Sequence, residues 1–364
     1  MYTIDGFFRF HLIVSIKQMK NNKIKGFDGI RGIAVLFVLL SHFSFHKFIH
    51  ENVGLSYIYL NLFDGGTGVN IFFVLSGFLI TLLLLREYEK NDRISLKNFY
   101  IRRALRIYPI YVLFLFIATL LYFMTENFIS IKALIYSTFY IYNFLPLVSH
   151  SNILSHTWSL SVEEQFYLIW PLFFTLMIKK HHIMLLIGVL LFAFSSLLWH
   201  VLLYRAHMDY YYNVDRFTFI SGYTIAFGCA AAMLIRNKLF QRCIRVVGLV
   251  LGILLYFSPA FLLKAPVTLQ YFIQTIGIVF LVSWIYLHQS GRIVSLLENP
   301  ILCYLGKISY GIYLYQGLFI SHHEPYGFWP PSKTITFICL IILCPLSFRY
   351  IETYFLRLKS KYSV

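Results

Sequence analysis

FDGIRGIAVLFVLLSHFSFH, residues 27–46, is the stretch that decides the fold of this chain. It is long and apolar enough to enter a bilayer as a helix, yet it carries Arg31 near one end and His42 in its interior. The eleven positions from Arg31 to His42 equal three helical turns plus about 20°, so both side chains share one face, roughly 16 Å apart along the axis. Ionisable groups inside a bilayer commonly mark function. The structural alternative is that His42 bonds a neighbouring helix while Arg31 anchors the helix at the membrane edge.

The composition is that of a polytopic membrane protein. Hydrophobic residues make up 59% of the 364 residues and charged residues only 13%, against about 25% charged residues in soluble domains. The net charge of +16 invites a nucleic-acid partner, but the basic residues fall between apolar stretches and not on one folded face. A positive-inside distribution explains them better. We therefore expect a lipid environment and no nucleic acid.

Apolar stretches of bilayer length predict an all-α, polytopic transmembrane helical bundle of about ten spans. Both termini then lie on the cytoplasmic side. Residues 1–26 form a basic N-terminal extension, 27–356 the membrane domain and 357–364 a short basic tail. The expected spans are residues 31–50, 68–86, 106–124, 158–178, 183–203, 217–235, 246–263, 269–288, 308–322 and 333–350.

Residues 131–148 are apolar enough for an eleventh span, but the positive charges argue against a crossing. With ten spans, six of the 31 Lys and Arg residues lie outside, namely Lys47, Lys132, Arg205, Arg216, Lys264 and Lys333. A crossing at 131–148 would move the basic residues near Lys179 and Arg236 to the outside as well, against the positive-inside rule. We therefore expect a re-entrant or interfacial segment there.

Three arginines mark the start of the third span, in FYIRRALRIYPIY, residues 99–111. On a helix Arg102 and Arg106 share a face, as do Arg103 and Arg106. With Arg31 at the same membrane surface, four arginines can converge on one polyanion, because arginine binds phosphate through bidentate, charge-assisted bonds. The alternative is that they only set the topology and contact anionic lipid headgroups.

Ser76 of the second span and two glutamates of HTWSLSVEEQFYLIWP, residues 156–171, lie at membrane depth. Ser76 is followed by glycine, so close helix packing is an alternative to a functional role. Glu163 and Glu164 point about 100° apart, which lets one face inward while the other caps the helix. An inward Glu163 near His42 would orient the imidazole and raise its basicity. The residues alone do not rank the two glutamates.

Further polar residues are supporting candidates. Asp215 and Arg216 follow a tyrosine cluster and suit a sugar ligand on the outer face, or equally an interfacial aromatic belt. Tyr310 is buried in the ninth span and needs a partner across helices, and Asp28 stands one turn before Arg31. No metal is expected, because the histidine pairs at 181–182 and 322–323 lack ligand spacing in a polar framework.

Seven stretches, in order, resemble the acyltransferase-3 family of integral membrane O-acyltransferases. They are FDGIRGIAVLFVLLSH, FFVLSGFLIT, RRALRIYP, WSLSVEEQFYLIWP, DRFTFISGYTIAFG, LGKISYGIYLY and FRYIET, and they cover residues 27–356. The resemblance implies an enzyme of the bacterial plasma membrane that takes an acyl group, usually acetyl, from cytoplasmic acetyl-CoA. The implied acceptor is a hydroxyl of an extracytoplasmic or lipid-linked glycan, such as O-antigen, capsule, exopolysaccharide or peptidoglycan.

The resemblance also implies roles for individual residues. The essential arginine and histidine of the family fall on Arg31 and His42, and its glutamate falls on Glu163. Its basic motif falls on Arg102, Arg103 and Arg106. Where many members have a late histidine in Tyr-Leu-Trp-His, this chain has Gln316, which argues against a proton relay at that position and is compatible with a different acceptor.

Residues and resemblance together predict a mechanism. The phosphates of acyl-CoA bind the four arginines, and the pantetheine arm follows the first span to bring the thioester near His42. His42, oriented by Glu163, then acts as general base on the acceptor hydroxyl or first accepts the acyl group covalently. The alternative is a glycan transporter, flippase or export partner without transferase activity, although the sequence has no paired inverted repeats.

Overall fold

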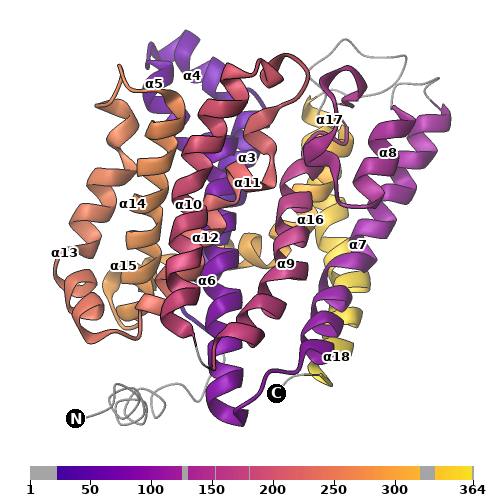
Figure 1. Cartoon of the computed structure of the whole chain (residues 1–364). Helices are drawn as coiled ribbons and strands as arrows, with labels where there is room; N and C mark the ends of the chain where they lie inside the picture. The colour runs from indigo at the N-terminus through magenta and orange to yellow at the C-terminus, as the bar shows by residue number, and fades with distance from the viewer. Residues whose placement is uncertain (1–22, 125–129, 152, 180, 320–332, 363–364) are drawn as a thin grey trace, which may run out of the picture.

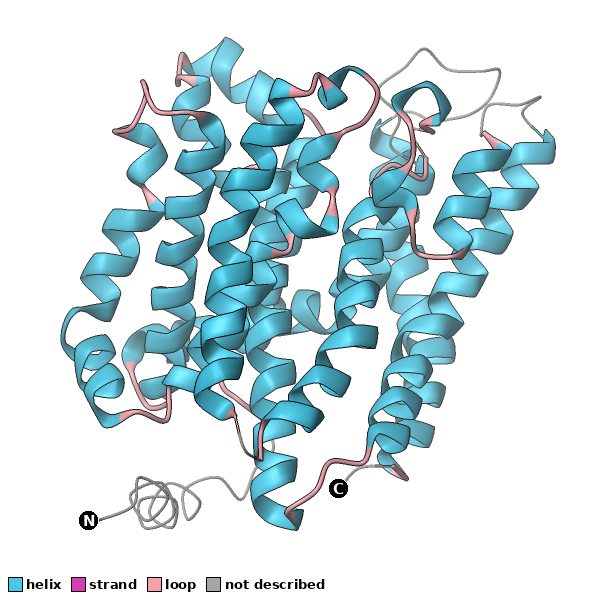
Figure 2. Cartoon of the chain, viewed as in Figure 1, coloured by secondary structure: helices cyan, strands magenta, loops and turns pink. Residues whose placement is uncertain are grey.

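The computed structural model describes residues 23–124, 130–151, 153–179, 181–319 and 333–362. These residues form helices and connecting turns without a β-strand (Figure 2), apart from one isolated bridge between Pro146 and Tyr212. The all-α prediction is confirmed for this part of the chain. Most of the predicted N-terminal extension, and the histidine pair at 322–323, lie outside the described residues.

The helices alternate in direction along one bundle (Figure 1). In chain order they are α3 (Phe27–His42), α4 (Phe45–Val53), α5 (Tyr57–Leu60), α6 (Gly65–Asn91), α7 (Leu96–Met124), α8 (Ile131–Thr138), α9 (Thr157–Met177), α10 (His182–Arg205), α11 (Thr218–Ser221), α12 (Tyr223–Leu234), α13 (Lys238–Tyr256), α14 (Val267–Leu287), α15 (Arg292–Leu297), α16 (Pro300–Phe319), α17 (Lys333–Ser347), a π-helical turn (Phe348–Glu352) and α18 (Thr353–Ser360).

The bundle has two ends. We call the end that holds α15 and α18, at the bottom of Figure 1, the terminal face, and the end that holds α4, α5 and α8, at the top, the opposite face. Gly26 donates its backbone N–H to Glu298 Oε1 at 2.7 Å. Because α3 starts directly after Gly26 and α16 directly after Asn299, both helices begin at the terminal face and run in the same direction.

Six helical segments in the described residues are long and apolar enough to cross a membrane. They are residues 61–91, 96–124, 182–205, 238–256, 267–287 and 333–360. The predicted span 31–50 is interrupted, because Ser44 adopts a left-handed conformation (φ 58°) and α4 departs from α3 at 70°. Counted as one span, this bent pair makes a seventh. The membrane-protein prediction is supported, but the count of about ten spans is not confirmed.

The segment 131–148 contains α8, of eight residues, and two 3₁₀ turns. A helix of eight residues is about 12 Å long, well short of a bilayer's hydrocarbon core. Tyr111 of α7 donates its hydroxyl to the Ser137 carbonyl at 2.7 Å, and Ser137 Oγ lies 3.1 Å from Thr157 Oγ1 of α9. The segment is therefore held between α7 and α9 and does not add a crossing.

Glycines bring the central helices into backbone contact. A Cβ added at Gly306 of α16 would lie 1.8 Å from the Asp28 carbonyl oxygen of α3, and one at Gly77 of α6 would lie 2.1 Å from the Ile225 carbonyl oxygen of α12. Only glycine permits such approach. The close helix packing expected at Ser76 and its following glycine is therefore present at Gly77. The same close contact fixes α3 against α16, the two helices that carry much of the candidate site.

Candidate active site

A cavity of about 90 Å³ lies between α3, α6, α7, α9 and α16. Its walls combine apolar side chains with serines, tyrosines, arginines and glutamates from five separate parts of the sequence. The predicted site residues among them are Arg31, Ser76, Arg103, Arg106, Glu163, Glu164 and Tyr310. Such a gathering of ionisable groups inside an apolar bundle is the feature expected of a binding or catalytic site.

Arginines form the end of the cavity nearer the terminal face. The Arg103 guanidinium carbon lies 3.8 Å above the centre of the Tyr167 ring, in cation–π contact, and its Nε has no hydrogen-bond partner among the described residues. Arg31 Nη1 is 3.8 Å from Asp28 Oδ1, an ion-pair distance longer than a hydrogen bond. Guanidinium donors held in place but not fully bonded can receive a multivalent anion.

Lys359 adds a fifth cation that the sequence did not single out. It lies in α18, close enough to Arg31, Arg102, Arg103 and Arg106 for electrostatic repulsion with each. A lysine in a basic segment that follows an apolar one ordinarily marks topology, so no sequence signal separated it from its neighbours. Packing of α18 against α7 decides its position. Residues 357–360 of the predicted short tail belong to this helix.

We call Arg31, Arg102, Arg103 and Arg106 the arginine group. Arg102 belongs to it but has its own partners. Its Nη2 lies 3.1 Å from Glu87 Oε2 of α6, and its Nη1 donates to the Tyr362 carbonyl at 2.8 Å. Glu87 Oε1 also accepts the Ser95 N–H at 2.8 Å, which holds the turn between α6 and α7. Arg102 does not line the cavity, so its contacts within the described residues are those of a structural ion pair.

Glu163 is hydrogen-bonded inside the cavity. It contacts the hydroxyls of Ser76 and Tyr167, and Tyr167 donates to Ser76 Oγ at 2.9 Å. Ser76 is thus a hydrogen-bonding site residue as well as a small residue at a helix contact. Glu164 lines the same cavity. The alternative in which one glutamate caps the helix is wrong, because α9 is preceded by His156 and no side chain caps it.

His42 stands at the last position of α3, beyond the upper end of the cavity. His156, at the start of α9, lies close enough for the two imidazoles to interact electrostatically. Glu163 is seven residues further along α9, roughly 10 Å away from His156 along the axis. The printed bonds of Glu163 go to Ser76 and Tyr167. The role of Glu163 in orienting His42 therefore stays a prediction, and His156 is a further residue close to His42.

The supporting candidates Asp215 and Arg216 have different partners. Asp215 binds His200 Nε2 at 2.8 Å and accepts from Tyr204 at 3.2 Å, whereas Arg216 lies over the Trp158 ring at 5.5 Å. The adjacent Asp-Arg pair thus serves two different contacts.

Tyr310 and Asp28 have contacts of different kinds. Tyr310 bonds across helices as expected, donating to the Ile107 carbonyl of α7 at 3.2 Å. Asp28 lies 3.7 Å from Lys23 at the terminal face. In the described part of the chain, no group of three or more His, Cys, Asp or Glu residues could hold a metal ion.

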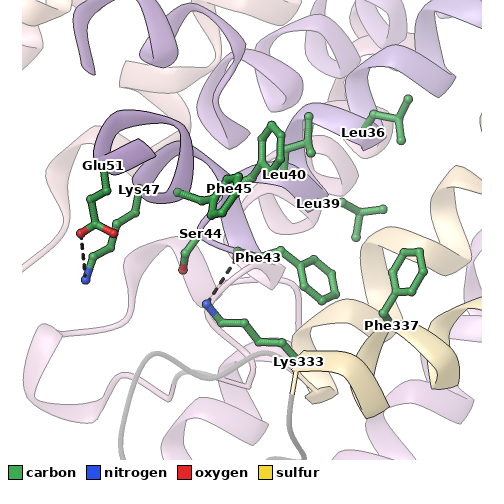
Figure 3. Close-up of a pocket in the computed structure, with 11 residues that line it drawn as sticks. Leu36, Leu39, Leu40, Phe43, Ser44, Phe45, Lys47, Glu51, Lys333 and Phe337 are labelled. Carbon is green, nitrogen blue, oxygen red and sulfur yellow. Dashed lines mark hydrogen bonds and ion pairs between the residues drawn. The ribbon is translucent and has the colours of Figure 1, made fainter. Parts of the chain in front are cut away.

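A larger groove of about 660 Å³ lies outside the bundle, between the α3–α4 bend and α17 (Figure 3). It is lined by leucine and phenylalanine side chains, and its lysines are both occupied. Lys47 lies 3.7 Å from Glu51, and Lys333 donates to the Phe43 carbonyl at 3.4 Å. Because it lacks the convergent ionisable groups of the smaller cavity, we place the chemistry in the cavity.

Comparison with known proteins identifies the family. Residues 24–350 match the family model described as an acyltransferase domain. The chain belongs to the acyltransferase-3 family. It is 30% identical to the Staphylococcus aureus protein named "Putative O-acetyltransferase SACOL0978", over 93% of this chain and 58% of that protein. It is 29% identical to "Peptidoglycan O-acetyltransferase OatA" of Listeria monocytogenes, over 91% of this chain and 55% of that protein.

This member of the acyltransferase-3 family therefore spans little more than half the length of the curated relatives it matches. No solved structure matches it.

Proposed function

We propose that the chain is a membrane O-acyltransferase that moves an acetyl group from acetyl-CoA to a hydroxyl of a cell-envelope glycan. The observation that carries the proposal is the arrangement along α3. The arginine group surrounds Arg31 at one end of the cavity, and His42 lies beyond the other end. A phosphate-binding group and a general base roughly 16 Å apart match the two ends of an acyl-CoA molecule.

The arginine group is the proposed site for the nucleotide phosphates. Arg31, Arg103 and Arg106 line the cavity and Lys359 lies beside them. Charge-assisted bonds to phosphate are short and strong, and they reduce the mutual repulsion of these cations. Glu163 lies deeper in the cavity. Its carboxylate would repel the phosphates and so favour the neutral pantetheine arm there.

His42 is the proposed base. Its imidazole takes the proton of the acceptor hydroxyl as the hydroxyl oxygen attacks the thioester carbon. The new C–O bond forms, the C–S bond breaks, and the imidazolium returns the proton to the departing CoA sulfur. Covalent transfer through the His42 ring is the second route that fits the same residues. An apolar bundle around the site protects the thioester from water.

Charge distribution supports a cytoplasmic terminal face, since the six predicted outer cations stand at or near helix ends of the opposite face. A bacterial plasma membrane is the setting that fits this orientation. The name of the Listeria relative favours peptidoglycan as acceptor, with O-antigen, capsule or exopolysaccharide as the other glycans in the class.

The test is acetyl transfer from radiolabelled acetyl-CoA to glycan by the purified chain, with His42→Ala as the variant. His42→Ala should reduce turnover at least a thousandfold while acetyl-CoA binding persists, because the arginine group is intact. His46→Ala, a histidine of α4 that does not line the cavity, is the matched control and should retain activity. Full activity in His42→Ala would refute the role of His42. Glycan movement without acetyl transfer by the wild type would instead indicate a transporter.

A further inference from the structure

Polar side chains continue above the cavity, toward the opposite face, along two helices, α9 and α16. On α9, Ser159 and Glu163 line the cavity and His156 lies one turn above Ser159. On α16, Ser309 and Tyr313 line it and Gln316 follows one turn above. Residues three, four and seven positions apart share a helix face. The cavity-lining stripe of each helix therefore ends in a polar side chain that the mechanism above does not use.

His156, Gln316 and His42 lie at about the same height in the bundle. Gly32 of α3 packs on the Leu302 carbonyl of α16, and both helices start at the terminal face. Ten residues beyond Gly32, His42 is thus roughly level with 312–316. His156 is level with Gly317, where an added Cβ would lie 1.9 Å from its Cε1. His42, His156 and Gln316 therefore lie at a similar height, where α3, α9 and α16 meet.

Gln316 and His156 carry unused hydrogen-bonding capacity. The Gln316 side chain is fully buried, and neither its amide oxygen nor its amide nitrogen has a partner among the described residues. His156 is 6% exposed, and both ring nitrogens lack a hydrogen bond of acceptable geometry there, although the Ile153 and Leu314 carbonyls lie nearby. Burying such groups without partners is costly, so a ligand that both donates and accepts hydrogen bonds fits this point.

A second pair of residues separates this point from the cavity. Tyr313 OH lies 2.5 Å from Ser159 Oγ and donates to the His156 carbonyl at 3.0 Å. The bonded pair stands between the glutamates below and the histidines above. On the far side, Arg216 reaches Ser155 Oγ at 3.4 Å, one residue before His156. His156 and Gln316 thus lie beyond this bonded pair as seen from the arginines, toward the opposite face.

We infer that His156 and Gln316 bind the acceptor, holding the reacting sugar hydroxyl against His42. The hydroxyl donates its hydrogen to an imidazole nitrogen of His42 and accepts a hydrogen bond from the Gln316 amide N–H. Because the amide cannot take up a proton, it orients the hydroxyl, and His42 takes up the proton. This inference rests on the proposed function. It assigns acceptor binding to these residues of α9 and α16 and leaves donor binding with the arginines.

The test separates acceptor from donor. The purified full chain transfers acetyl from acetyl-CoA to chitotetraose, a soluble β-linked amino-sugar oligomer, and CoA release is followed with a thiol reagent. Gln316→Leu should raise the KM for chitotetraose about tenfold, the loss expected for one hydrogen bond, with the KM for acetyl-CoA unchanged. Gln316→His, which restores a hydrogen-bonding ring, should keep the acceptor KM within about threefold of wild type. His156→Leu should give the same acceptor-specific defect as Gln316→Leu.

The chain provides a matched control in Gln274 of α14. This glutamine is also fully buried with neither amide atom bonded among the described residues, but α14 packs mainly against α6, α12 and α13. Both Gln→Leu variants should leave the Tm unchanged or raised, because each removes an unpaired buried amide; only Gln316→Leu should alter the acceptor KM. An unchanged acceptor KM in Gln316→Leu, or an equal rise in both KM values, overturns the inference. Wild-type protein that transfers no acetyl group refutes the proposed function, and the inference with it.

Discussion

Gly306→Ala tests whether the contact between α3 and α16 holds the site together. The added Cβ would lie 1.8 Å from the Asp28 carbonyl oxygen, against 3.4 Å for ordinary contact. Because the obstacle is backbone, no side-chain rotation relieves it, and the helices must separate by about 1.5 Å. Such overpacking costs about 1–3 kcal/mol of stability. It also moves Tyr310 and Tyr313 of α16 away from Arg31 of α3.

A displacement of this size at a reacting centre reduces turnover about a hundredfold. The assay is acetyl-CoA turnover by purified protein, with the Tm measured in parallel to confirm that the variant is folded. Gly188→Ala is the matched control, since an added Cβ at this α10 position meets nothing within 4 Å. It should keep full turnover and gain about 0.5–1 kcal/mol from helix propensity. Wild-type turnover in Gly306→Ala would refute the close packing of α3 on α16.

Two further predictions concern charged groups at the terminal face. Arg103→Gln should weaken binding of coenzyme A about tenfold or more, measured by calorimetry, whereas Arg102→Gln should mainly lower the Tm by breaking the Glu87 pair; equal losses of affinity would contradict this division of roles. Partial burial opposes ionisation of Glu298, but the Gly26 N–H and Lys23 outweigh it and hold the Glu298 pKa below its usual value. The stability it contributes, at most about 1 kcal/mol, is therefore present above the unfolded-state pKa of about 4.3 and is lost as the pH falls through the lower folded-state pKa. The Tm difference between wild type and Glu298→Gln should be constant from pH 6 to 8 and shrink below about pH 4, and a difference that grows in acid would contradict the assignment.

The sequence identified much of the candidate site because its residues lie at helical spacings in unusual surroundings. Arg31 and His42 share a face of one helix, and the arginines of α7 lie within one turn of each other. Such relations depend only on helix geometry. Glu163 and Ser76 stood out for a similar reason, as polar groups in apolar segments that require partners wherever the helices pack.

Contacts between helices could not be predicted in the same way. The bonds of Glu163 to Ser76 and Tyr167, and the approach of His156 to His42, depend on the height of α9 in the bundle. The span predicted for 31–50 ends early because Ser44 takes a left-handed conformation, which local apolarity does not reveal.

The sequence by itself determined the all-helical membrane character, the family and the face of the first helix that carries Arg31 and His42, because hydropathy and helical period are local properties of the chain. Only the tertiary structure decided which helices share a height. That choice depends on backbone contacts at glycines such as Gly306, and it brings Lys359 to the arginines and Gln316 level with the histidines. Residues hundreds of positions apart meet through helix packing, and a local sequence pattern does not determine which of them meet.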